Sequence, residues 1–176
     1  NLVSKGEKIL CALSGGADSV AMTLVLHENR EALGIDVVAA HVNHMLRGAE
    51  ADRDEEFCRC FCERHGIPFV ALRGDAAKLA REMGTGTEDA ARTLRYSLLN
   101  GISSDKIAVA HNADDNLETV VMRLARGGGT RGLSGIPPVN GKVIRPIMVL
   151  SRSEVEEFCR SRSESWVTDS TNLEDD

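Results

Sequence analysis

The sequence has no apolar run long enough to cross a lipid bilayer, which takes about 18 residues or more. It also lacks the pattern of a secretory signal, because Lys5 and Lys8 are followed by only a short apolar segment. These absences argue against an integral membrane protein and against a secreted one. We therefore expect no membrane partner.

Paired cysteines are missing as well. None of the five cysteines has C-x-x-C spacing, and Cys58, Cys60 and Cys62 alternate along one predicted helix, where residues two apart do not share a face. This pattern gives poor support to a zinc or iron–sulfur site. It favours thiols that serve packing in a reducing cytoplasm, where disulfides are rare.

Positive charge is also in short supply, since the formal net charge of −6 argues against a uniformly basic nucleic-acid binder. Acidic residues are nevertheless absent between Glu118 and Glu154. The basic residues of that stretch are Arg123, Arg126, Arg131, Lys142, Arg145 and Arg152. A basic stretch on an acidic protein can form a phosphate-binding surface, and a chance grouping of solvated charges is the alternative.

The chain has the size and composition of one soluble globular domain, with 176 residues, of which 42% are apolar and 27% are charged. We expect a single domain over residues 1–176. Because the sequence starts with Asn1 and stops in an acidic segment at Asp176, we also expect it to be one domain of a longer protein.

The most informative stretch runs from Ile9 to Val20. An apolar segment leads into Ser14-Gly15-Gly16, and a helical apolar pattern follows, which predicts a buried strand, a glycine turn and a helix N-terminus. Backbone N–H groups and the helix dipole make such a junction an anion site. Ser14 and Ser19 add hydroxyl donors, and Asp18 adds a carboxylate that could hold Mg²⁺ against phosphate oxygens. The stretch therefore predicts a nucleotide phosphate loop.

Two common phosphate loops do not match this stretch. No Lys follows the glycines, as G-x-x-x-x-G-K-[ST] requires, and G-x-G-x-x-G is absent here. Residues 14–19 do match S-G-G-x-D-S, and in this the chain resembles the PP-loop ATP pyrophosphatases, which split ATP into AMP and pyrophosphate. The resemblance implies that Ser14, Gly15, Gly16, Ala17, Asp18 and Ser19 bind ATP.

Strands and helices alternate along the predicted chain. This order predicts a doubly wound α/β fold with a mainly parallel sheet and helices on both faces. Ligands of such folds bind at the carboxyl ends of the strands. The strands are expected at 8–13, 36–42, 69–72, 106–110 and 143–144, and the helices at 18–33, 51–65, 75–83, 88–100 (capped by Thr87), 114–126 (capped by Asn112) and 152–162.

A second polar group follows the strand predicted at 106–110. His111 ends that strand, Asp114 and Asp115 fall in the first turn of the next helix, and Glu118 lies one turn further on. These carboxylates would face the same crevice as Asp18, and two of them could share Mg²⁺ on a triphosphate. One carboxylate or His111 could act as a base on an amine nucleophile. Ordinary helix capping is the alternative reading.

With these two polar groups in place, the chain resembles the N-terminal domain of the tRNA(Ile)-lysidine synthases. The resemblance extends through nearly the whole chain in order. Its motifs are S-G-G-x-D-S at 14–19, His41-Val42-Asn43-His44, Leu46-Arg47, Glu50-Ala51-Asp52, Thr87 to Arg92, Arg95-Tyr96, His111 to Thr119, Arg126-Gly127, Arg131-Gly132-Leu133, Arg145-Pro146 and Asp169-Ser170-Thr171-Asn172. We expect the tRNA-contacting domains that usually follow to lie outside these 176 residues.

The resemblance implies a ligase that uses ATP and Mg²⁺. Such enzymes adenylate C2 of the wobble cytidine in tRNA(Ile) with a CAU anticodon and release pyrophosphate. Free L-lysine then attacks C2, AMP leaves, and lysidine is formed. The resemblance also implies a cytoplasmic enzyme, and a homodimer is left open.

The resemblance also assigns roles to residues. Asp18, His111 and Asp115 would be catalytic, with Asp18 and Asp115 also holding the metal. Arg92 and Arg95 lie three apart on one helix face and could balance the α-phosphate or hold tRNA. We assign Arg95 to ATP. The tRNA-binding set is Arg92, Arg126 and Arg131. Arg126 precedes a glycine loop at 127–132 and Arg131 lies within it, and this loop is suited to cover the site.

Other functions remain open. One is a different PP-loop enzyme acting on tRNA, such as a 2-thiolating enzyme, although those with iron–sulfur clusters need cysteine pairs. Another is an amidating nucleotide synthetase, which the motifs at 87–96 and 169–172 disfavour. The third is a non-catalytic ATP-binding regulator, which would have no need for carboxylates at a second strand end.

Overall fold

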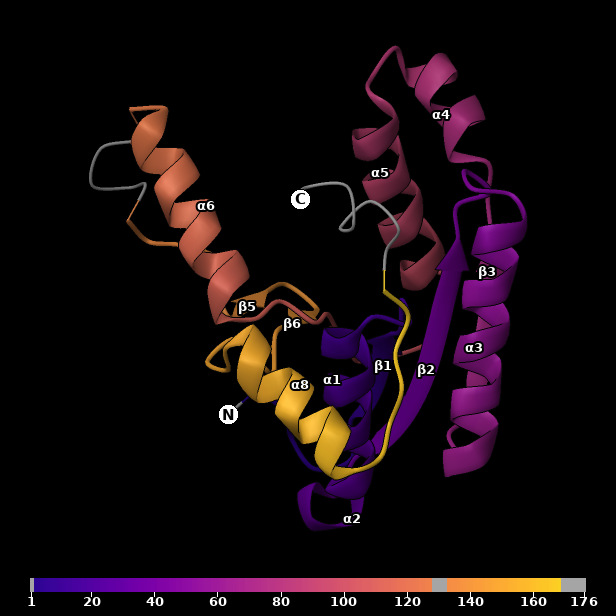
Figure 1. Ribbon diagram of the computed structural model, residues 1–176, viewed down its shortest axis with the longest axis vertical. Coiled ribbons are helices and arrows are strands. Elements are labelled where there is room, and N and C mark those ends of the chain that lie inside the picture. Colours follow the sequence, from indigo (N-terminus) through magenta and orange to yellow (C-terminus); the bar gives the residue numbers. More distant parts are fainter. Residues whose placement is uncertain (1, 128–132, 169–176) are drawn as a thin grey trace.

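A computed structural model of the chain describes residues 2–127 and 133–168 (Figure 1). Strands and helices alternate as the sequence predicts. In chain order they are β1 (Lys8–Ala12), α1 (Ala17–Glu28), α2 (Arg30–Leu33), β2 (Asp36–Asn43), α3 (Ala49–His65), β3 (Phe69–Arg73), α4 (Ala76–Met83), α5 (Thr87–Asn100), β4 (Lys106–Ala108), α6 (Ala113–Ala125), β5 (Val139–Asn140), β6 (Val143–Ile144) and α8 (Arg152–Ser161).

The strands form one six-stranded sheet in the order β3-β2-β1-β4-β6-β5. All pairs are parallel except β5 with β6. The chain adds β2 and β3 on one side of β1 and then returns to add β4 and β6 on the other. The sheet therefore reverses its direction of growth between β1 and β4, and a doubly wound fold opens a binding crevice at such a point.

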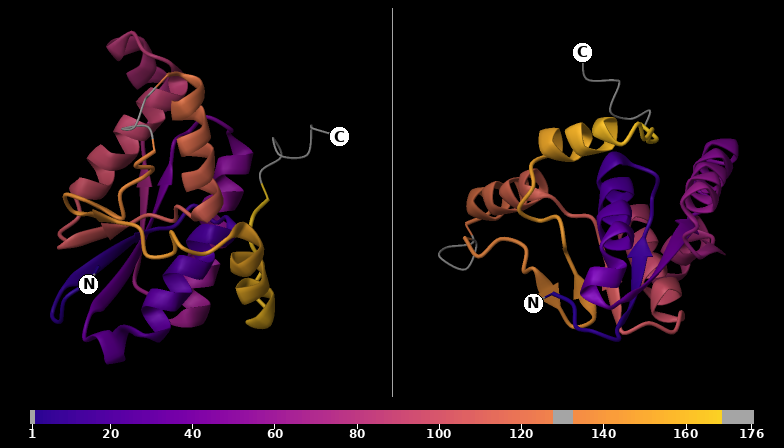
Figure 2. Two further views of the ribbon diagram at one scale, coloured as in Figure 1. Left: turned by 90° about the vertical axis from the view of Figure 1, so that its left-hand side faces the viewer. Right: turned by 90° about the horizontal axis from the view of Figure 1, so that it is seen from below.

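Helices cover both faces of this sheet, as expected for the fold. Residues of β1 alternate between the faces, so that Ile9 and Cys11 pack in one core cluster and Leu10 packs in another. The first cluster is completed by α1, α3 and α8, and Figure 2 (right) shows α8 beside α1. The second cluster includes Leu99 of α5. The predicted fold class is confirmed.

Helix α6 differs from the others because none of its residues is buried. It extends away from the sheet (Figure 1), and its exposed face carries Leu117, Val121 and Met122. Its N-terminus nevertheless sits at the end of β4 and is capped as predicted. Asn112 accepts from the Asp115 N–H at 2.9 Å, and Asp115 accepts from the Asn112 N–H at 3.0 Å.

Three local predictions were wrong. The helix expected over 18–33 is divided into α1 and α2 at Asn29, whose side chain donates to the Val25 carbonyl oxygen at 2.8 Å and so competes with the helix. Gly86, not Thr87, is the N-cap of α5, and no side chain caps it. The strand expected over 106–110 ends at Ala108, although Val109 N–H still donates to the Ile144 carbonyl.

The short β5–β6 hairpin was predicted only in part. Its second strand, 143–144, was expected, but Val139–Asn140 was not, because two residues give no recognisable alternation. Gly141 turns the chain between them with a φ of +59°, a value that favours glycine. Among the described helices, none is both long enough and apolar enough to cross a membrane.

Candidate functional site

A cavity of about 700 Å³ lies at the carboxyl ends of β1, β2 and β4. One wall is the loop after β1, another is α5 with Arg95 and Leu99, and a third is formed by the N-terminal turns of α6. The cavity therefore occupies the crevice where the sheet reverses direction. Its size and its mixture of apolar and polar walls suit a nucleotide-sized ligand.

Ser19 organises the loop after β1 from within. Its hydroxyl is buried, donates to the Gly16 carbonyl at 2.9 Å, and accepts from the N–H groups of Ser14 and Gly15, both at 3.1 Å. The sequence predicted Ser19 as a donor to phosphate, but in this conformation its hydroxyl holds the loop together. The amides available to a ligand are those in the first turn of α1, which have no acceptor within the helix.

The loop residues divide between the cavity and the core. Ser14, Gly16, Asp18 and Ser19 line the cavity, whereas Ala17 packs against the core. Gly15 is buried with a φ of +101°, and a Cβ there would lie 3.2 Å from a methyl group of Val167. Its carbonyl accepts from the Val167 N–H at 2.9 Å. Glycine at this position therefore lets the loop pack against the segment that follows α8.

Asn112 joins the two acidic groups that the sequence predicted to meet. Its side-chain amide donates to the Asp18 carboxylate at 3.0 Å, while its backbone N–H donates to the Asp115 carboxylate at 3.0 Å. Asn112 is completely buried. The structure thus brings the loop after β1 and the N-terminus of α6 together through one side chain.

The environment of Asp18 disfavours its charge. Burial raises the pKa of Asp18, the Asn112 hydrogen bond opposes that rise, and the nearby Asp115 charge adds to it. In both carboxylates only one oxygen takes part in the bonds to Asn112. Although the described residues contain no cluster of three or more metal ligands, this donor set fits Mg²⁺, which needs one or two carboxylates beside substrate phosphates.

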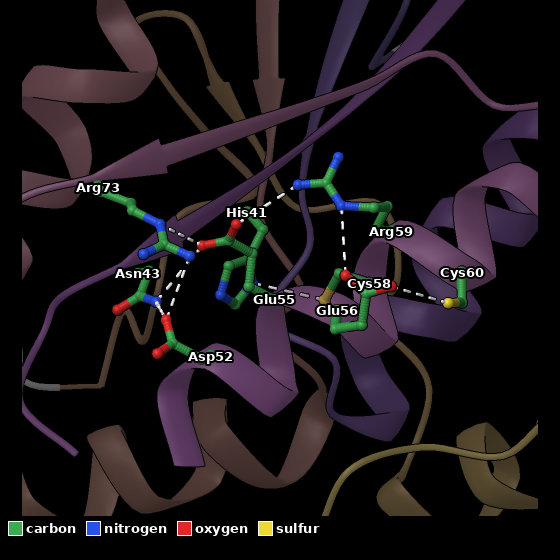
Figure 3. A network of polar contacts seen from close by, with 9 residues as sticks. All are labelled: His41, Asn43, Asp52, Glu55, Glu56, Cys58, Arg59, Cys60 and Arg73. Carbon is green, nitrogen blue, oxygen red and sulfur yellow. Dashed lines mark hydrogen bonds and ion pairs between the residues drawn. The ribbon is translucent and has the colours of Figure 1, made fainter. Parts of the chain in front are cut away.

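A polar network fixes the end of β2, which forms another wall of the cavity (Figure 3). Buried Glu55 accepts from Arg73 Nε at 2.9 Å and from the Asn43 amide at 3.4 Å. Asn43 in turn accepts from the N–H of Met45, which has a left-handed φ of +57°. The network holds the turn that brings His44 to the cavity.

His41 connects β2 with the loop after β1. Its Nδ1 lies 2.9 Å from the Leu13 carbonyl oxygen and 3.4 Å from the Cys58 sulfur. Burial lowers the pKa of His41 and that of His44, so both imidazoles favour the neutral form in this crevice. The sequence named both histidines as part of the motif at 41–44 but gave them no role.

His111 and Arg95 face the same cavity from β4 and α5. Burial and the Arg145 charge lower the pKa of His111, whereas Asp115 opposes this effect. The Nδ1 atom of His111 and the Nε atom of Arg95 are buried without a hydrogen-bond partner among the described residues. These two predicted site residues therefore present unsatisfied polar atoms beside the cavity.

The predicted tRNA-binding arginines are not gathered around the cavity. Arg92 is exposed on α5, one turn from Arg95, and both guanidinium groups lie over the ring of Tyr96. Arg126 caps the far end of α6, about 20 Å from its start at 1.5 Å per residue. Arg131, the loop at 128–132 and the motif at 169–172 lie outside the described residues.

Arg145 was named in the basic stretch and in the Arg145-Pro146 motif, but the sequence argument assigned it no place in the site. It directly follows β6 and is only 6% exposed. Its position after a parallel strand was the signal that could have found it. Its Nη1 donates to the Pro137 carbonyl at 2.6 Å, and its Nε has no partner among the described residues.

The cysteines behave as predicted with one exception. Cys11, Cys58, Cys62 and Cys159 are buried and Cys60 is exposed, and all are free thiols. Burial raises the pKa of Cys11 and of Cys62 to about 12 and that of Cys159 to about 11. The buried thiols therefore stay protonated and serve packing.

Curated relatives share the sequence of this domain. The chain is 46% identical over 180 residues to a tRNA(Ile)-lysidine synthase of Clostridium perfringens. This alignment covers 99% of this chain and 38% of the relative. The chain is 43% identical over 174 residues to one from Bacteroides thetaiotaomicron, covering 97% of this chain and 40% of the relative. The chain thus spans about two fifths of these relatives' length.

Solved structures share its fold. The U34-tRNA thiolase NcsA from Methanococcus maripaludis with its [4Fe-4S] cluster has a TM-score of 0.75 at 23% identity, covering 94% of this chain and 60% of that one. The NH3-dependent NAD synthetase from Campylobacter jejuni has a TM-score of 0.57 at 18% identity, and the match covers 92% of this chain and 66% of that one. The sequence model of the PP-loop domain matches residues 1–176. The chain therefore belongs to the PP-loop domain family.

Proposed function

We propose that this chain is the ATP-binding and catalytic domain of an enzyme that converts the wobble cytidine of a CAU-anticodon tRNA(Ile) to lysidine. The cytidine O2 would attack the α-phosphorus of ATP, and pyrophosphate would leave. The ε-amine of free L-lysine would then attack C2, and AMP would leave. A cytoplasmic location and a homodimer are part of this proposal.

One observation carries the proposal beyond the names of the relatives. Asn112 binds Asp18 and Asp115 at once, so the loop after β1 and the acidic start of α6 share one cavity. A protein that only bound ATP would need the loop but not this second acidic group. The arrangement therefore supports a reaction at ATP rather than nucleotide binding alone.

The loop would hold the departing pyrophosphate. In the first turn of α1, the N–H groups of Ala17, Asp18 and Ser19 lack acceptors within the helix and lie at the positive end of its dipole. Gly16, the N-cap, leaves room for a phosphate to approach the backbone. Arg95 would neutralise phosphate charge from the α5 wall.

Asp18 and Asp115 are the residues that would hold Mg²⁺. Their carboxylate oxygens are the hard ligands that this ion prefers, and a cation between them would relieve the mutual repulsion that adds to the raised pKa of Asp18. When bound, the ion would supply charge neutralisation for the triphosphate.

His111 is the proposed base. The ε-ammonium group of lysine must lose a proton before its nitrogen can attack C2. Burial and Arg145 keep the pKa of His111 below its usual value, so the imidazole is neutral near pH 7 and can accept that proton. Its place beside Asp115 lets it act at the point where the proposed second step occurs.

The direct test is product formation from defined substrates. The chain is incubated with ATP, Mg²⁺, a tRNA(Ile) transcript with a CAU anticodon, and L-lysine, and pyrophosphate, AMP and lysidine are measured. We expect pyrophosphate release to require the tRNA, and lysidine and AMP to appear only with lysine. Asp18→Asn and Asp115→Asn should each lower the rate by about 100-fold or more, the cost of losing an electrostatic group in a closed site.

Asp89→Asn is the matched control, because Asp89 is exposed on α5 away from the cavity and loses the same charge. It should retain the rate of the unchanged chain. Product formation driven by a sulfur donor, or by glutamine or ammonia in place of lysine, would refute the lysidine assignment. Full activity of either Asp18→Asn or Asp115→Asn would refute the role of that carboxylate.

A further inference from the structure

Arg95 lines the α5 wall of the cavity, and two further arginines, Arg92 and Arg145, lie near it behind that wall. Arg92, Arg95, Tyr96 and Leu99 are spaced by three, four and seven residues on α5 and therefore share one helix face. Along this face exposure decreases, from exposed Arg92 through half-buried Arg95 to fully buried Leu99. The two guanidinium carbons lie 5.3 and 5.4 Å from the Tyr96 ring centroid.

Arg145 joins this group from the sheet. Val143 packs in the core cluster that includes Leu99 of α5, and residues two apart on a strand point to the same face, so Arg145 continues on the α5 side. His111 lines the cavity two residues after Val109, which belongs to the same cluster. Arg145 interacts electrostatically with both Tyr96 and His111, which agrees with this placement.

These three cations have no carboxylate partner among residues 2–127 and 133–168. Several other described arginines do have one, including Arg73 with Glu55 and Arg162 with Glu28. An arginine as buried as Arg145, with its Nε unsatisfied, is costly unless an anion completes its hydrogen bonds. The cluster therefore has the composition of an anion-binding subsite. The N–H donors of a guanidinium group are arranged so that two of them can bind a phosphate group together.

We propose that Arg145 and Arg92 form a subsite for a phosphodiester of the RNA substrate, with Arg145 as its buried anchor, while Arg95 serves the phosphates of ATP from the cavity wall. This inference rests on the proposed function, because tRNA is the polymer that would supply the phosphodiester. Two features favour RNA over a phosphate of ATP. Arg145 follows β6, two strands and therefore about 10 Å from the phosphate loop after β1, and Arg92 opens the subsite to solvent.

The subsite would also position the substrate for the proposed base. His111 lines the cavity together with Asp115, and the charge of Arg145 also acts on it. Arg145 further binds the Pro137 carbonyl, and the neighbouring Ile136 lines the cavity. A phosphodiester held at Arg145 would thus place its nucleotide at the edge of the cavity where the chemistry is proposed.

The test measures RNA and ATP binding separately. Binding of a fluorescently labelled anticodon stem-loop RNA with CAU is followed by anisotropy between about 50 and 200 mM salt. We expect Arg145→Gln and Arg92→Gln each to weaken RNA binding by about tenfold and to reduce the salt slope by about 0.7, the value for one phosphate contact on a single strand. ATP affinity should change less than about threefold in both.

Arg53→Gln is the matched control, since Arg53 is exposed on α3, which covers the opposite face of the sheet. Arg92→Gln keeps the test decisive if Arg145→Gln does not fold, because Arg92 is exposed. RNA affinity and salt slope equal to those of Arg53→Gln would overturn the proposal. A loss of ATP affinity with an unchanged RNA salt slope would also overturn it, because the subsite would then serve a nucleotide phosphate.

The outcome can be separated from that of the proposed function. If the RNA contacts are found but no lysidine forms from lysine, the subsite stands and the proposed reaction fails. If lysidine forms and the KM for tRNA is the same in Arg92→Gln, Arg145→Gln and the unchanged chain, the reaction stands and the subsite fails.

Discussion

Asp18 shows how a single residue can be placed for function at a cost in stability. Its carboxylate is half-buried, and its one described hydrogen bond comes from Asn112. Burial and the repulsion from Asp115 together raise its pKa despite that bond. The charged Asp18 carboxylate therefore lacks hydrogen-bond donors and a counter-charge until a cation or a ligand donor binds to it.

Asp18→Asn should therefore stabilise the unliganded chain at neutral pH. A raised pKa means that the folded state binds the Asp18 proton more tightly than the unfolded state, so the ionised carboxylate opposes folding above its folded pKa. The Tm of Asp18→Asn should exceed that of the unchanged chain at pH 7, and the difference should shrink as pH falls toward the ordinary pKa of aspartate. Thermal melts without Mg²⁺ or ATP over this pH range would measure it. An equal or lower Tm at pH 7 would contradict the argument.

Helix α6 depends on its first residues, because none of its residues is buried and its apolar side chains face solvent. The capping box of Asn112 and Asp115 satisfies two N–H groups that the helix cannot. The same Asn112 side chain donates to Asp18. One buried residue thus starts the helix and ties it to the phosphate loop.

Asn112→Ala should cost about 2 kcal/mol, since a lost cap costs about 1 kcal/mol and a lost hydrogen bond to a charged group about as much again. For a chain of this size, that corresponds to a fall in Tm of about 4–8 °C. Asn112→Ser keeps a capping oxygen but is too short to reach Asp18, so it should recover about half of the loss. Urea unfolding of both variants is the measurement. If Asn112→Ser is as unstable as Asn112→Ala, the cap contributes nothing.

At the scale of the whole molecule, the segment after α8 closes the back of the phosphate loop. Buried Glu164 lies 2.7 Å from His65 Nε2 and 3.2 Å from Arg64 Nη2, at the end of α3. Three residues later, Val167 donates its N–H to Gly15 and lines the cavity. A contact between α3 and the end of the chain therefore supports the loop from a distance.

Glu164→Gln should weaken this support without touching a ligand. It removes the carboxylate charge from its contacts with partly exposed His65 and Arg64, which we expect to cost about 1–2 kcal/mol after solvent screening. ATP binding by the loop should weaken several-fold as residues 164–168 loosen. Calorimetric titration with ATP, beside Glu157→Gln as an exposed control on α8, would measure this. Unchanged ATP affinity in a destabilised Glu164→Gln would show that the segment supports the fold alone.

Much of the fold was readable from local sequence. Buried apolar strands, glycine turns and helix signals alternate clearly, and the Asn112 cap was predicted because capping depends on neighbours within one turn. The errors at Asn29, Thr87 and Val139–Asn140 lie where one side chain or one short pairing decides the outcome. Such local competition leaves little trace in hydrophobic periodicity.

The sequence by itself determined the fold class and the motif of the phosphate loop, because both follow from residues adjacent in the chain. It also predicted that Asp18 and Asp115 face one crevice, since the carboxyl ends of parallel strands share an edge. Only the tertiary structure decided the rest. The inward use of the Ser19 hydroxyl, the packing of Gly15 on Val167 and the approach of Arg145 to α5 each depend on contacts between distant segments. Those contacts arise from packing, which no periodicity along the chain encodes.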